Sequence, residues 1–103
     1  MPFGDFVNQI PPIGFLIVHI ALFAAGSYFA WRSFQAGVTL LGFAFSLFAL
    51  AEITYMTYHL DWTVFLFAHT IAELLDLAAF VLVFAAAVLT VVRRPATAEP
   101  SRA

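Results

Sequence analysis

The sequence is poor in charged residues, which make up 10% of its 103 positions, whereas hydrophobic residues make up 64%. A soluble domain usually carries about 25% charged residues. A water-facing surface cannot be built from so few charges, so we expect lipid to cover most of this protein. Cysteine is absent, which excludes disulfides, thiolate metal sites and iron–sulfur clusters. The net charge of −2 comes with no basic stripe, so nucleic acid is not an expected partner.

Three long apolar runs occupy most of the chain, over residues 13–34, 38–58 and 62–92. A helix needs about 20 apolar residues to span a bilayer, and the third run is long enough to tilt or protrude. The sequence therefore predicts an all-α membrane protein, a bundle of three transmembrane helices over about 13–34, 37–59 and 62–93. Together they form one transmembrane domain, 13–94.

Basic residues predict the orientation of these helices. Arg32 lies in the first turn, and Arg93 and Arg94 follow the third helix, whereas the N-terminal segment and the second turn contain no Lys or Arg. The positive-inside rule then places segment 1–12 outside the cytoplasm, and a flexible tail, 95–103, inside it. Residues 1–14 also lack the basic start of a secretory signal. We expect a multi-pass protein of a bacterial-type inner (cytoplasmic) membrane.

Six ionisable residues interrupt the apolar runs or lie at their edges, and such residues usually face the interior of a bundle and find partners. They are His19, Glu52, His59, His69, Glu73 and Asp76. Counting from the two turns at 1.5 Å per residue places His19, Glu52 and His69 at one depth, about 12–14 Å below the outer face. Glu73 follows His69 by one helical turn, and Glu52, Tyr55 and His59 share a face of the second helix.

This convergence of imidazoles and carboxylates suits a transition metal ion, namely zinc, iron, manganese or copper. The predicted ligands are His19, Glu52, His69 and Glu73. Haem or chlorophyll fits less well, because Glu52 would face a mostly apolar macrocycle. Two other hypotheses stay open. Glu52 and His69 can form a buried hydrogen-bonded pair that fixes helix register. Alternatively, the groups can form a proton or ion relay in which Asp76, His59 and Tyr55 take part.

The expected function follows from size and from the absence of motifs. The sequence has no phosphate loop, nucleotide motif or catalytic triad spacing, so an enzyme is not favoured. Three helices expose most of their surface to their surroundings. We therefore expect a small accessory subunit of a larger respiratory or photosynthetic-type membrane complex. The alternatives are a stand-alone homo-oligomer that binds metal or relays protons or cations, and a small membrane metalloenzyme.

Overall fold

The computed structural model describes residues 3–93, and this part of the chain is helical apart from short turns. A 3₁₀-helix, η1 (Asp5–Gln9), precedes three α-helices, α1 (Pro12–Gln35), α2 (Thr39–His59) and α3 (Phe65–Val92). All three α-helices are long and apolar enough to cross a membrane. The second and third helices begin two and three residues later than the ranges 37–59 and 62–93 expected from the sequence. The tail 95–103 lies outside the described residues.

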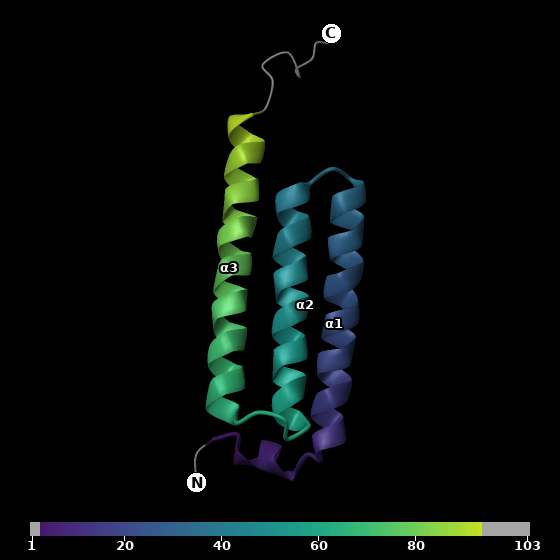
Figure 1. Cartoon of the computed structure of the whole chain (residues 1–103), viewed down its shortest axis with the longest axis vertical. Helices are drawn as coiled ribbons and strands as arrows, with labels where there is room; N and C mark the ends of the chain where they lie inside the picture. The colour runs from purple at the N-terminus through teal and green to yellow at the C-terminus, as the bar shows by residue number, and fades with distance from the viewer. Residues whose placement is uncertain (1–2, 94–103) are drawn as a thin grey trace.

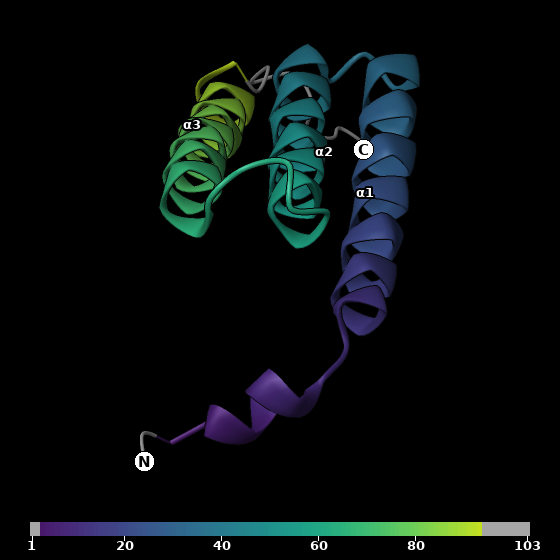
Figure 2. The same cartoon turned by 60° about the horizontal axis from the view of Figure 1, so that its bottom comes forward.

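The three helices run antiparallel in a row, with α2 between α1 and α3 (Figures 1 and 2). Both outer helices pack against α2, and within residues 3–93 they do not pack against each other. The bundle is therefore an open layer with two faces. One end of the layer carries Arg32 and Arg93, and we call it the basic end. The other carries Asp5 and Asp61, and we call it the acidic end.

Both connections between the helices use the same type of C-terminal cap. After α1, Val38 N–H donates to Ser33 O, and Gly37 adopts a left-handed φ of 81°. After α2, Trp62 N–H donates to Thr57 O, and Asp61 takes the left-handed position with a φ of 65°. These are Schellman motifs, in which glycine is the usual left-handed residue. The second turn uses an aspartate where glycine would fit with less strain.

Small residues fill the helix interfaces. The buried residues of α3 are all alanines, namely Ala68, Ala72, Ala79 and Ala86, and they share one face of the helix. Gly26 on α1 is also buried, and a Cβ built there would lie 2.9 Å from the Phe48 ring of α2. Small residues allow helix backbones to approach closely, as they do in membrane bundles.

Large apolar side chains lie on the outside instead of in a core. Phe80 and Phe84 of α3 are 73% and 71% exposed, and in the described chain no large side chain is fully buried. A soluble monomer rarely exposes so much contiguous apolar surface. The distribution of small residues inside and large ones outside is compatible with a multi-pass membrane protein.

Candidate functional site

The histidines and the acidic residues of the three helices gather in the half of the layer nearer the acidic end. Helix α2 supplies Glu52, Tyr55 and His59, which lie on one face because they are three and seven residues apart. Glu52 contacts α1, and Tyr55 contacts α3. The central helix thus links polar groups from both neighbours, and the candidate site spans all three helices.

The tightest contact of the site joins α1 to α2. His19 Nδ1 lies 2.6 Å from Glu52 Oε1, and the two side chains are 16% and 6% exposed. Glu52 is the only charged residue that the described chain buries. With Nδ1–H as donor and the carboxylate as acceptor, this is a short, charge-assisted hydrogen bond. It satisfies Glu52 and fixes the orientation of the His19 ring.

A second pair joins α2 to α3, and it is less buried than the first. Tyr55 OH donates to Glu73 Oε2 over 2.8 Å, but Glu73 itself is exposed. Asp76 follows three residues later, and its Oδ1 is buried without a hydrogen-bond partner in residues 3–93. The carboxylates of α3 are therefore less completely paired than Glu52.

Aromatic rings connect the three histidines. The His19 ring stacks on Tyr55 and on His59, with both centroid distances at 5.2 Å. On the other side of this group, His69 lies 6.4 Å from Tyr55. Two phenylalanines complete the cluster, since Phe15 stacks on His59 at 4.9 Å and Phe65 stacks on His69 at 5.1 Å.

The structure brings the residues of the predicted site together in two groups. His19, and not the expected His69, is the hydrogen-bond partner of Glu52, and it also stacks on His59. Glu73 bonds to Tyr55 and lies on the same helix as His69 and Asp76. The Tyr55 ring, which stacks on His19, joins the two groups. Across the described residues, no group of three or more His, Asp or Glu side chains is arranged to hold a metal ion. The metal-ion prediction therefore stays a prediction, and the observed contacts are pairwise.

Sequence reasoning missed two residues that contribute to the cluster. Phe15 and Phe65 pack on histidine rings, and each lies four residues before a histidine of its own helix, Phe15 before His19 and Phe65 before His69. Such a spacing puts both side chains on one helix face. His59, expected as a possible member of a relay, stacks its ring on His19.

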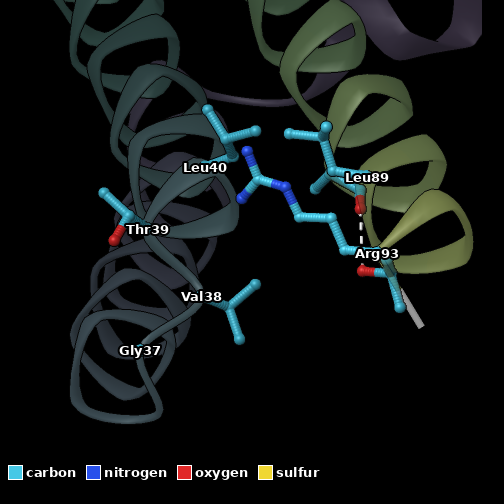
Figure 3. Close-up of a pocket in the computed structure, with 8 residues that line it drawn as sticks. Gly37, Val38, Thr39, Leu40, Leu89 and Arg93 are labelled. Atoms are coloured by element: carbon cyan, nitrogen blue, oxygen red, sulfur yellow. Dashed lines mark hydrogen bonds between the residues drawn. The ribbon is translucent and has the colours of Figure 1, made fainter. Parts of the chain in front are cut away.

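Two pockets flank the layer at opposite ends. One, of about 270 Å³, lies at the acidic end between η1 and the end of α2, and His59 and Asp61 are among the residues that line it. The other, of about 460 Å³, lies at the basic end between the start of α2 and the end of α3. There the side chain of Arg93 extends from α3 toward Leu40 of α2 (Figure 3). Only the first pocket reaches the polar cluster.

Comparisons with known proteins add no family to this picture. No protein-family model matches the chain, and no curated protein or solved structure resembles it significantly. The chemistry of the site must therefore be argued from its own residues. The pairs can hold helices in register, pass protons between neighbouring groups, or present an imidazole whose other nitrogen binds a ligand.

Proposed function

We propose that the chain is a small accessory subunit of a larger assembly in a bacterial-type cytoplasmic membrane, of the respiratory or photosynthetic kind. It crosses the bilayer three times, with the basic end in the cytoplasm and the N-terminus outside. The orientation follows from Arg32 and Arg93 at one end of the layer, because cytoplasmic loops carry the excess of basic residues.

The observation that carries the proposal is the incomplete pairing on α3. His69 and Glu73 are exposed, and Asp76 Oδ1 has no partner in the described part of the chain. Asp76 is 11 residues into α3, about 17 Å along its axis, which is close to the middle of a hydrocarbon core about 30 Å thick. Lipid chains cannot hydrogen-bond the exposed carboxylate of Glu73, one turn before Asp76, and polar residues near this depth usually face other protein.

Co-purification tests the proposal. The full chain, tagged and extracted from its native membrane in mild detergent, should elute with larger subunits in fixed stoichiometry. A lone homo-oligomer would instead favour the alternative, a stand-alone protein that binds metal or relays protons or cations.

Site-specific photo-crosslinking adds a matched control. Phe80 and Leu74 are 73% and 57% exposed, and six residues of helix place them about 120° apart. Phe80 lies on the flank of Glu73, and Leu74 faces away from it. A photoreactive residue at Phe80 should crosslink to protein, and one at Leu74 mainly to lipid.

A bound metal ion remains a second proposal for the cluster, and one contact favours it. Metal-binding histidines commonly donate a hydrogen bond from the N–H of their other ring nitrogen to a carboxylate. His19 Nδ1 lies at hydrogen-bond distance from the Glu52 carboxylate in this way. His19 would then bind the ion through Nε2, with Glu52 as the orienting group, and His69 or Glu73 would complete the site with residues of the partner. Metal analysis and an absorption spectrum of the intact assembly test this. His19→Ala should remove the metal, and equal metal content would refute the assignment.

A further inference from the structure

The two membrane-embedded carboxylates of α3 have fewer hydrogen-bond partners and less burial than the one on α2. Glu52 is 4% exposed and has a histidine from the neighbouring helix at hydrogen-bond distance. Glu73 is exposed and receives one tyrosine hydroxyl, whereas Asp76 is half-buried, and its Oδ1, enclosed within the chain, receives no donor in residues 3–93. The chain therefore provides a close hydrogen-bond partner for one of its three intramembrane carboxylates. The other two, on one flank of α3, have incomplete hydrogen bonding.

The chain has no arginine or lysine of its own to place there. Its arginines are Arg32, Arg93, Arg94 and Arg102, and it contains no lysine. Arg93 is 17 residues from Asp76, about 25 Å along α3. A second copy with the same orientation would bring its own Glu73 and Asp76 to the same depth. Carboxylates of the two copies would then face one another, and their like charges would repel. A different chain is therefore the source of further donors for Glu73, which is exposed, and for the Asp76 carboxylate, which is half-buried.

We propose that the flank formed by His69, Glu73 and Asp76 binds a transmembrane helix of a partner that carries an arginine or lysine near the middle of the bilayer. This inference rests on the proposed function and adds the chemistry of the partner to it. Intramembrane charges are expensive alone and are commonly paired with one another. A guanidinium or ammonium group supplies several N–H donors, which suits two carboxylates one helical turn apart. Tyr55 OH would keep its bond to Glu73 beside the new contact.

Designed transmembrane peptides test this chemistry without the native partner. The probes are leucine-based helices with a central Arg, Lys, Leu or Glu, and their association with the labelled full chain is measured by energy transfer in phosphatidylcholine vesicles. The Arg and Lys peptides should associate about tenfold more tightly than the Leu peptide, the range that an intramembrane polar contact supplies. The Glu peptide should bind no better than the Leu peptide.

Conservative variants identify the responsible residues. Glu73→Gln and Asp76→Asn keep the side-chain shape and remove the charge, so the double variant should lose the preference for Arg and Lys. Binding of the Leu peptide should not change, which shows that the fold is intact. Asp61→Asn is the matched control, because Asp61 is a carboxylate in the turn between α2 and α3, and it should keep the full preference.

Equal binding of all four peptides would overturn the inference, as would an equal preference for Arg in the double variant. Self-association of the chain in place of peptide binding would also overturn it, and would make a second copy the occupant of this flank. These results differ from a failure of the proposed function. If larger subunits co-purify but the peptides show no charge preference, only the partner chemistry is wrong. If the native chain purifies as a lone homo-oligomer, the accessory-subunit proposal itself fails.

Discussion

The contact between His19 and Glu52 makes a quantitative prediction about helix packing. The perturbation is a double-mutant cycle of His19→Leu, Glu52→Met and the double variant, in which each new side chain is apolar and of similar size. Either single change leaves one polar partner behind in a buried place, because the His19 and Glu52 side chains are 16% and 6% exposed. The double change removes both.

The expected magnitudes follow from the cost of an unpaired buried group. Removing one partner of a buried ion pair typically costs about 3–5 kcal/mol, whereas replacing both partners by apolar residues is often neutral. We expect His19→Leu to be the more costly single change, since it strands the carboxylate, which is the more buried of the two groups. The double variant should be more stable than either single variant, with a coupling energy of at least about 2 kcal/mol.

Unfolding of the purified chain in mixed micelles, followed by circular dichroism with a chelator present, measures these energies. Thr90→Ala serves as a control, because within residues 3–93 the Thr90 hydroxyl bonds only to the Ala86 carbonyl of its own helix at the basic end, and the substitution should change stability little. Additive effects of the two substitutions, within about 0.5 kcal/mol, would refute direct coupling of His19 and Glu52.

Three other predictions address packing, the second turn and topology. Gly26→Leu should destabilise the α1–α2 interface by about 1–3 kcal/mol through overpacking. Gly42→Leu should cost less, because its clash is with the ring of Phe34, which is half-exposed and can swing aside. Equal melting temperatures of the two variants would contradict this prediction. Asp61→Gly should raise the free energy of unfolding by about 0.5–1 kcal/mol. A left-handed φ costs an L-residue about 1–2 kcal/mol, but glycine loses more conformational entropy on folding, which offsets part of the gain. Unchanged denaturation curves would count against this prediction. A reporter fused after Arg94 should be active only in the cytoplasm, and external labelling of a cysteine at Ser33 but not at Asp61 would reverse the proposed orientation.

Helical rise explains how far the fold and the site could be predicted from the sequence. The apolar runs were sufficient to predict three helices, because length and hydropathy determine which segments can span a bilayer. The depth count correctly suggested that His19 and Glu52 could meet, since the rise per residue is fixed and the first turn is short. The observed hydrogen bond between them follows from adjacent helices at equal depth.

Depth alone could not predict the arrangement around the helix axes. It placed His69 in the same layer as His19, but α1 and α3 do not pack against each other within the described residues. His69 therefore lies near Tyr55 of α2. Whether three helices close into a triangle or stay in a row depends on the shape of their interfaces. Here the alanines of α3 pack against one side of α2, and the glycines of the α1–α2 interface lie on its other side. The sequence pattern gave no direct signal for that choice.

The open row also explains why the polar cluster occupies only one half of the protein. Every histidine and acidic residue of the three helices lies nearer the acidic end, whereas the other halves of α1, α2 and α3 contain none. Close contacts such as Gly26 against Phe48 can hold the apolar half by themselves. The polar pairs are therefore not needed to hold the entire layer together, and their presence requires a separate reason. A row leaves Glu73 exposed and Asp76 half-buried on one flank of α3, and a closed triangle would cover this flank with its own third helix. The same geometry that leaves these carboxylates incomplete thus creates the surface on which a partner helix can supply their donors.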